Sequence, residues 1–349
     1  MTTISKLIMS ALRAIACVAI ATAAAAQGGV TSYHVAQRYT LGGDGGWDYV
    51  ILDSVANRLF IGRQNRVMVV DETSGTLLGE IPGLSAAHGT ALDYATGHGF
   101  ATSGRDSSVV MFDLKTLNVL GRTTAADDAD AILYDPASRR VFTFNGDANS
   151  SSVIDPATGK RVGTIALGGK PEYGVSAGNG LLYANIEDKA EIVEINARTQ
   201  QLTKKRWSLA PCASPTGLAI DRAHHLLFSG CRNHLMAISN AETGRLITTL
   251  PIGAGVDATA YDPAMKNAYA SNGDGAVTVV HEESPKRFRV VETVTTMPGA
   301  RTMALDPRSH RLYLVSAQFG PTPTESTAAN PRRRPPIISG SFTLLVLER

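Results

Sequence analysis

Seven residues occupy one recurring position of this sequence, eleven or twelve residues before a recurring aromatic residue. They are Asp48, His88, Asp130, Glu172, Thr216, Asp257 and Arg301. Carboxylate oxygens gathered at one place bind hard cations such as Ca²⁺ and Mg²⁺, or a positively charged ligand. The candidate metal ligands are therefore the four carboxylates, Asp48, Asp130, Glu172 and Asp257.

Grouped carboxylates repel one another, so a proton or a bound cation would relieve the repulsion. The alternative is that these polar residues bind loop amides and face water, without a ligand. Further polar and aromatic residues stand close to the recurring position or in the loops that share its face: Trp47, Arg105, Asp127, Asp128, Asn145, Tyr173, Asn185, Asn233 and Asn272.

The elements that must position these residues form an internal repeat. Each unit has a short apolar strand, an Asp, a turn and a second strand with an aromatic residue. The Asp positions are 53, 93, 135, 221, 262 and 306, and the aromatic residue follows seven positions later. The remaining unit has Ser176 near the Asp position and Tyr183 as its aromatic residue. The average period of about 42 residues is the length of a four-stranded propeller blade.

The repeat predicts an all-β protein, a seven-bladed β-propeller with four antiparallel strands per blade. The seventh unit ends after three strands, near residues 302–305, 311–316 and 342–347. We expect its fourth strand to come from residues 33–39, so that the N-terminal strand closes the last blade. In such a ring the seven recurring residues meet at one end of the central channel, and we call them the channel mouth.

These units resemble the YVTN-repeat, YncE-like β-propellers. The resemblance rests on residues 152–159 (SVIDPATG), 215–221 (PTGLAID) and 306–313 (DPRSHRLY), and it extends over residues 30–349. It implies the propeller fold but little about function, because relatives include exported proteins of unknown role and some linked to nucleic acid. More distant relatives, of the 6-phosphogluconolactonase type, are enzymes.

Residues 1–26 have the pattern of a signal peptide: a charged start, a short apolar run and an Ala-rich end. We expect cleavage there, a single propeller domain over 27–349, no transmembrane segment after cleavage, and a periplasmic or secreted monomer. The chain has 33 Lys and Arg against 31 Asp and Glu. Since Lys6 and Arg13 lie in the leader, the mature chain is neutral, which disfavours binding of nucleic acid through overall charge.

Cys212 and Cys231 remain after the leader, in a compartment where paired thiols become disulfides. Cys212 precedes the first strand of the fifth unit, and Cys231 follows the second strand. Antiparallel pairing of these strands brings both cysteines to the same rim, so we expect a disulfide. The alternative is two separate buried thiols.

Basic residues gather at two places away from the channel mouth. Residues 204–206 together with 286, 287 and 289 lie on outer strands, and residues 318–338 form a Pro/Arg-rich insertion in the last blade with the run 331–336 (PRRRPP). We expect the insertion to be a flexible excursion. These residues are either solvated or dock to an anionic surface.

Two motifs look catalytic in isolation. Residues 174–178 match G-x-S-x-G, but a strand-turn-strand repeat does not supply the strand-to-helix turn of a nucleophile elbow. His224 lies in a turn on the opposite face, where we expect it to be solvated.

Our leading hypothesis is an exported, non-catalytic propeller that binds a ligand or protein partner at its acidic channel mouth. The alternatives are a lactonase-like hydrolase with a carboxylate or metal site at the mouth, and a single-stranded nucleic-acid binder.

Overall fold

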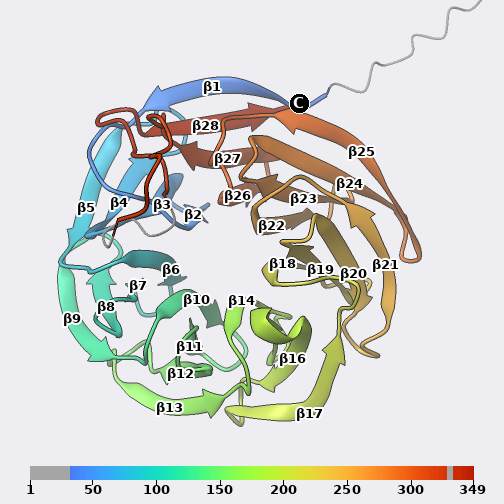
Figure 1. Cartoon of the computed structure of the whole chain (residues 1–349). Helices are drawn as coiled ribbons and strands as arrows, with labels where there is room; N and C mark the ends of the chain where they lie inside the picture. Colours follow the sequence, from blue (N-terminus) through green and yellow to red (C-terminus); the bar gives the residue numbers. More distant parts are fainter. Residues whose placement is uncertain (1–31, 328–332) are drawn as a thin grey trace, which may run out of the picture. The chain divides into compact units, whose positions relative to one another are not determined.

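The strands of the chain form seven separate four-stranded antiparallel sheets, arranged around a central axis (Figure 1). A computed structural model describes residues 32–327 and 333–349. The predicted leader and residues 331 and 332 of the basic run lie outside the described residues. The seven-bladed, all-β architecture predicted from the repeat is confirmed.

The first three blades follow one another along the chain. Blade 1 contains β2 (Val50–Asp53), β3 (Arg58–Arg63), β4 (Arg66–Asp71) and β5 (Leu77–Pro82). Blade 2 contains β6 (Ala87–Asp93), β7 (His98–Ser103), β8 (Ser108–Asp113) and β9 (Val119–Thr124). Blade 3 contains β10 (Ala129–Asp135), β11 (Arg140–Asn145), β12 (Ser150–Ile154) and β13 (Arg161–Ala166).

The next three blades continue in the same order. Blade 4 contains β14 (Pro171–Ser176), β15 (Leu181–Ile186), β16 (Glu191–Asn196) and β17 (Gln201–Ser208), with the 3₁₀ turn η1 (Glu187–Lys189). Blade 5 contains β18 (Pro215–Asp221), β19 (Leu226–Cys231), β20 (Leu235–Asn240) and β21 (Leu246–Pro251). Blade 6 contains β22 (Val256–Asp262), β23 (Asn267–Asn272), β24 (Ala276–Ser284) and β25 (Arg287–Thr295).

Blade 7 joins the two ends of the described chain. Its strands are β26 (Met303–Asp306), β27 (Arg311–Ser316), β28 (Thr343–Glu348) and β1 (His34–Thr40). The N-terminal β1 pairs antiparallel with the C-terminal β28, from His34 opposite Glu348 to Thr40 opposite Thr343. The predicted closure of the ring by the N-terminal strand is therefore confirmed, and β28 has no open edge.

The recurring Asp caps the turn that follows each innermost strand. Asp53, for example, accepts hydrogen bonds from the backbone amides of Val55 and Ala56, each at 3.2 Å. In blade 4 the hydroxyl of Ser176 does this work, since it accepts from the amide of Gly178 at 3.0 Å. The repeated residue thus satisfies turn amides that would otherwise lack a partner.

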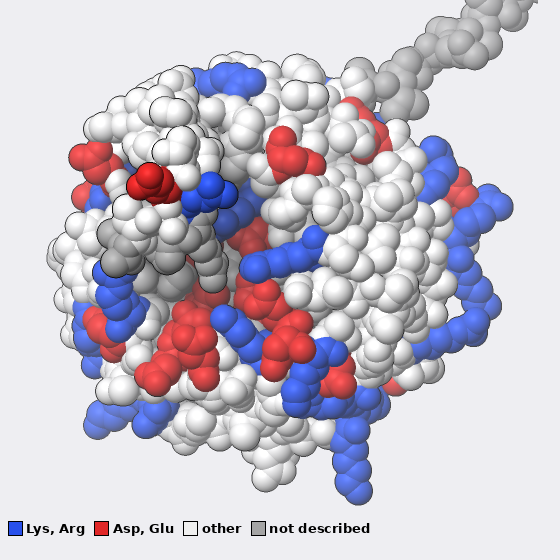
Figure 2. Space-filling view, in the orientation of Figure 1, with Lys and Arg blue, Asp and Glu red and all other residues white. Residues whose placement is uncertain are grey.

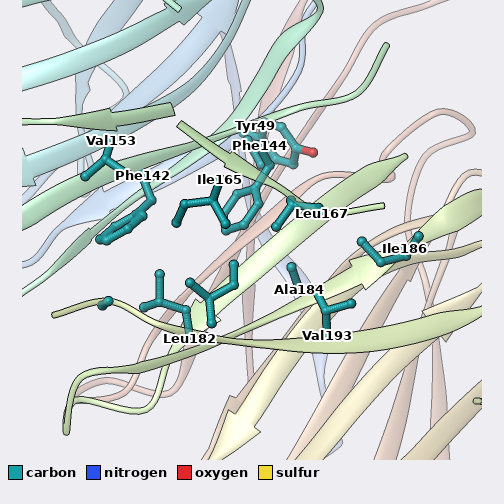
Figure 3. Close-up of a cluster of buried hydrophobic side chains, with 13 residues drawn as sticks. Tyr49, Phe142, Phe144, Val153, Ile165, Leu167, Leu182, Ala184, Ile186 and Val193 are labelled. Carbon is teal, nitrogen blue, oxygen red and sulfur yellow. The ribbon is translucent and has the colours of Figure 1, made fainter. Parts of the chain in front are cut away.

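The recurring aromatic residues fill the space between blades, and all of them are buried. Figure 3 shows the packing between blades 3 and 4, where Phe142 and Phe144 of β11 meet Leu182 and Ala184 of β15. A Cβ atom at Gly174 would lie 2.1 Å from the ring of Phe144. Glycine at that position therefore allows the ring to pack against β14.

A buried arginine holds the loop between β1 and β2. Arg63 has no exposed surface, and its guanidinium donates to the carbonyl oxygens of Asp44 at 3.1 Å and Gly45 at 2.8 Å. The same group lies 3.7 Å from the ring centre of Phe342, beside β28. Burial and the nearby charge of Arg66 lower the pKa of Arg63 to about 10, so it stays charged at neutral pH. Arg63 therefore joins the loop after β1 to the start of β28.

Candidate functional site

The predicted channel mouth lies where the innermost strands begin, at the centre of the ring. Figure 2 shows acidic side chains gathered around a central hollow. This cavity has a volume of about 340 Å³. Five of the seven predicted residues line it, namely Asp48, Asp130, Glu172, Asp257 and Arg301.

His88 joins the site from its edge, through two carboxylates. Its Nδ1 atom contacts a carboxylate oxygen of Asp48 from blade 1 and lies 3.3 Å from Oδ1 of Asp130 in β10. Burial lowers the pKa of His88, but hydrogen bonding to Asp48 and the charge of Asp130 raise it more, to about 9. The imidazole therefore carries a proton at neutral pH and bridges blades 1, 2 and 3.

Asp130 lies where burial and neighbouring acids disfavour its charged form. Burial raises its pKa well above the ordinary value, and the charge of His88 opposes this rise only in part. The neighbouring carboxylates of Asp48 and Glu172 raise it further. The repulsion predicted within the cluster thus raises the pKa of a carboxyl group that faces Asp48 and Glu172.

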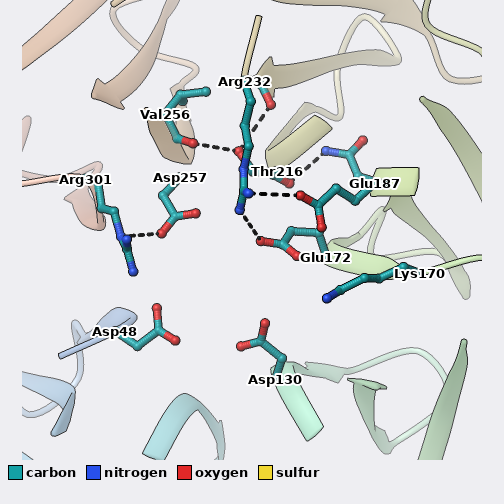
Figure 4. A network of polar contacts seen from close by, with 12 residues as sticks. Asp48, Asp130, Lys170, Glu172, Glu187, Thr216, Arg232, Val256, Asp257 and Arg301 are labelled. Atoms are coloured by element: carbon teal, nitrogen blue, oxygen red, sulfur yellow. Dashed lines mark hydrogen bonds and ion pairs between the residues drawn. The ribbon is translucent and has the colours of Figure 1, made fainter. Parts of the chain in front are cut away.

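Asp257 and Arg301 form an ion pair on the opposite side of the cavity, with 2.8 Å between Oδ2 and Nε (Figure 4). Burial raises the pKa of Asp257 to about 6, although the charge of Arg301 lowers it. Because Asp257 is the second residue of β22 and Arg301 precedes β26, the pair links blades 6 and 7.

Glu172 meets residues that the repeat did not predict. Arg232, from the loop between β19 and β20, lies 3.2 Å from Glu187 and 3.8 Å from Glu172 (Figure 4). Burial raises the pKa of Glu172 to about 8, and the charges of Glu187 and Asp257 add to the rise. Tyr49 also lines the cavity. Tyr49 directly follows Asp48, and that adjacency was the available signal for it.

The predicted disulfide is present and stands next to Arg232. Cys212 and Cys231 are bonded, with 5.7 Å between their Cα atoms. Asn233 binds the same segment, since its side chain accepts from the amide of Ala213 and donates to the carbonyl of Pro211, each at 2.9 Å. The segment before β18 therefore fixes the loop that carries Arg232 over the cavity.

Thr216 occupies the predicted position in blade 5 but does not line the cavity. It is fully buried, and its hydroxyl lies 3.0 Å from the carbonyl oxygen of Val256 and 3.3 Å from that of Gly230. The amide of Asn185 donates to the carbonyl oxygen of Thr216 at 2.9 Å. These two residues connect blades 4, 5 and 6, and Asn145 and Asn272 are likewise buried among backbone and hydroxyl groups.

Four of the six basic residues at the outer strands are paired with acids. Lys205 lies 3.2 Å from Glu194, and Arg206 lies 2.6 Å from Glu191. Arg287 and Arg289 both contact Glu283, at 2.5 and 2.8 Å. Neighbouring carboxylates thus reduce the positive field of these strands, which weakens the case for a phosphate-binding surface there.

His224 on the opposite face is not simply solvated, as we expected. Its Nδ1 lies 2.6 Å from Asp221 and 3.0 Å from Glu282, two buried carboxylates. In the G-x-S-x-G match, Ser176 donates to Asp135 at 2.6 Å and caps a turn, as a structural residue does.

Among residues 32–327 and 333–349, two groups place three ligand atoms within 4.8 Å of one another. They are Asp48, His88 and Asp130 at the mouth, and Asp221, His224 and Glu282 on the opposite face. Glu172 and Asp257, which we expected as ligands, belong to neither group. An imidazole nitrogen with two carboxylates suits Zn²⁺ or Mn²⁺ better than the expected Ca²⁺ or Mg²⁺.

Comparison with known proteins supports the fold. No family model matches the chain, and no curated protein matches it. The structure resembles hydrazine synthase of Kuenenia stuttgartiensis, with a TM-score of 0.67 and 15% identity over 76% of this chain and 91% of that chain. It also resembles the WD40 repeats of RRP9, with a TM-score of 0.74 and 10% identity over 91% and 99% of the two chains. The structure of U3-55K is similar too, with a TM-score of 0.73 and 10% identity over 90% of this chain and 99% of that chain.

The seven four-stranded sheets define a seven-bladed β-propeller, the architecture that these solved structures share. At these identities the likeness extends to the fold alone, and the YVTN-type resemblance stays a prediction. No helix in the described part of the chain is long and apolar enough to cross a membrane.

Proposed function

We propose that the chain is an exported, non-catalytic binding protein whose channel mouth holds a positively charged group of a ligand or protein partner. The observation that carries the proposal is the balance of acidic and basic side chains around the cavity. Five carboxyl groups there, those of Asp48, Asp130, Glu172, Glu187 and Asp257, stand against His88 and three arginines, Arg232, Arg301 and Arg334, so the acidic groups outnumber the basic ones by one. Burial and mutual repulsion favour the protonated forms of Asp130 and Glu172, and a bound cation would displace those protons. A cation entering the cavity would offset this excess.

Export is supported by the pattern of residues 1–26 and by the disulfide, because disulfides persist in oxidising compartments. A binding role without chemistry is supported by the ion pairs that hold the mouth together. Asp257 pairs with Arg301 and Glu172 with Arg232, so these carboxylates are positioned to bind positively charged groups.

The test is titration calorimetry of the purified chain with four cations: agmatine, spermidine, Ca²⁺ and Mg²⁺. We expect at least one to bind, with an affinity that falls as salt rises. The double variant Asp48→Asn, Asp130→Asn should bind at least tenfold more weakly, because it removes both carboxylates that flank His88.

The matched control is Asp106→Asn, which removes a carboxylate that pairs with Arg122 at 2.6 Å outside the cavity. It should bind as the wild type does. Absence of binding for all four cations, or equal binding by the double variant, would refute the proposal.

A second candidate function rests on a different observation, the three ligand atoms of Asp48, His88 and Asp130 within 4.8 Å. These residues would hold Zn²⁺ or Mn²⁺, which would supply a Lewis acid for a lactonase-like hydrolysis. Elemental analysis after incubation with each metal, followed by a lactone hydrolysis assay, tests it. His88→Ala should lose both metal and activity, whereas His224→Ala should keep both; an unmetallated wild type rules this function out.

A further inference from the structure

The insertion in the last blade returns to the channel mouth. Arg334, in the basic run of the insertion, lines the same cavity as Asp48, Asp130 and Glu172. The two prolines after it, Pro335 and Pro336, restrict the backbone to an extended conformation. An arginine between proline-rich flanks therefore stands at an acidic cavity.

The base of the insertion is held firmly, which determines where Arg334 lies. The amide of Gly320 donates to the carbonyl of Pro336 at 2.8 Å, and the amide of Ile338 donates to that of Gln318 at 2.9 Å. The ring of Phe319 packs on Trp47 with 6.0 Å between centroids. Ile337 packs against the core beside β28. Arg334 is thus two residues from an anchored position, Pro336.

The cavity already binds guanidinium groups of its own chain. Arg301 lies 2.8 Å from Asp257, and Arg232 lies 3.2 Å from Glu187. Asp48 and Asp130, by contrast, have their ion pairs with an imidazole, His88. A guanidinium presents a planar fork of donors that matches carboxylates, so the mouth is chemically suited to one more arginine.

We infer that the partner of the channel mouth is an arginine in an extended, proline-flanked peptide segment, and that the insertion supplies an internal copy through Arg334. The inference rests on the proposed function and names its ligand class. A tethered arginine at an effective concentration in the millimolar range competes with any external peptide. The mouth of the intact chain is therefore largely occupied by Arg334.

The test uses a blocked hexapeptide with the sequence of residues 333–338 (RRPPII) as the probe. Because Phe319 and Ile337 form a β-bridge, residues 321–335 can be replaced by a two-residue Asn-Gly turn without breaking the base of the insertion. We expect the shortened chain to bind the probe at least tenfold more tightly than the intact chain. Arg334→Ala in the full chain should give a gain of similar size.

The matched control is Arg333→Ala. The Arg333 guanidinium donates to the carbonyl of Thr324 at 3.3 Å and does not line the cavity. This variant should bind the probe as the intact chain does. Equal affinity of the intact chain, the shortened chain and Arg334→Ala would overturn the inference, as would an equal gain from Arg333→Ala.

Agmatine titrations on the same proteins separate this inference from the proposed function. If agmatine binds but the insertion changes neither agmatine nor peptide affinity, the mouth binds cations and Arg334 does not occupy it. If neither probe binds any of the proteins, both proposals fail. If Zn²⁺ alone binds, and the insertion does not change its affinity, the mouth is a metal site and the inference of a peptide partner is refuted.

Discussion

At the scale of single residues, the channel mouth is governed by the balance between burial and pairing. His88 is held between two carboxylates and stays protonated, whereas Glu172 shares one arginine with Glu187. Burial favours the neutral form of a carboxyl group when its counter-charge is shared or distant. The electrostatic contribution of the mouth to the free energy of unfolding therefore depends on pH.

Glu172 predicts how stability depends on pH. Its pKa is about 8 in the folded protein against an ordinary value of 4.5. Between these values the folded protein holds a proton that the unfolded chain releases, so rising pH favours unfolding. Glu172→Gln should remove this slope, which amounts to at most about 1.4 kcal/mol per pH unit. The free energy of unfolding by urea, measured from pH 5 to pH 8, checks it.

The variant and the wild type should differ least near pH 5 and most at pH 8, where the variant is the more stable. The same slope in both proteins would show that Glu172 is ionised in the fold at neutral pH.

At the scale of elements, loops rather than strands decide the site. The strand repeat was predictable because its signals are local: Asp53 caps a turn two residues away, and an aromatic residue seven positions later fills the core. Arg232 and Glu187 were not predictable from the repeat. They come from loops between second and third strands, and their pairing depends on distances between blades 4 and 5.

The disulfide fixes one of these loops. Replacing both Cys212 and Cys231 by Ser should lower the free energy of unfolding by about 3 kcal/mol, because the bridge closes a loop of 19 residues in the unfolded chain. Chemical denaturation with and without reductant measures this. Reductant should lower the stability of the wild type to that of the double variant, and an unchanged wild type would contradict the prediction.

The loop after β1 depends on a single buried side chain. Arg63→Met keeps an unbranched apolar stem but removes the donors to Asp44 and Gly45, so it should cost about 3 kcal/mol of stability. Arg66→Met, which removes an ion pair with Glu80, should cost less than about 1 kcal/mol. Thermal denaturation compares them, and equal losses would show that the buried guanidinium does not hold the loop.

At the scale of the whole molecule, the ring is closed by two strands far apart in sequence. Removal of residues 1–40 deletes β1 and exposes the edge of β28, so this truncation should oligomerise or aggregate. Removal of residues 1–31 keeps β1 and should leave a monomer. Size-exclusion chromatography with light scattering distinguishes the two outcomes. A monomeric, folded 41–349 fragment would show that the pairing of β1 with β28 is dispensable.

The pairing of β1 with β28 also determines when the ring can close during synthesis. During synthesis β1 is made before the strands of the other six blades, and its partner β28 is made after them. At a synthesis rate of about 5 to 20 residues per second, roughly 15 to 60 seconds pass between the synthesis of β1 and that of β28. Six blades can form from neighbouring segments within that interval, but the seventh cannot. The hydrogen bonds between β1 and β28 therefore form only after β28 has been synthesised, so a chain truncated before β28 cannot close the ring.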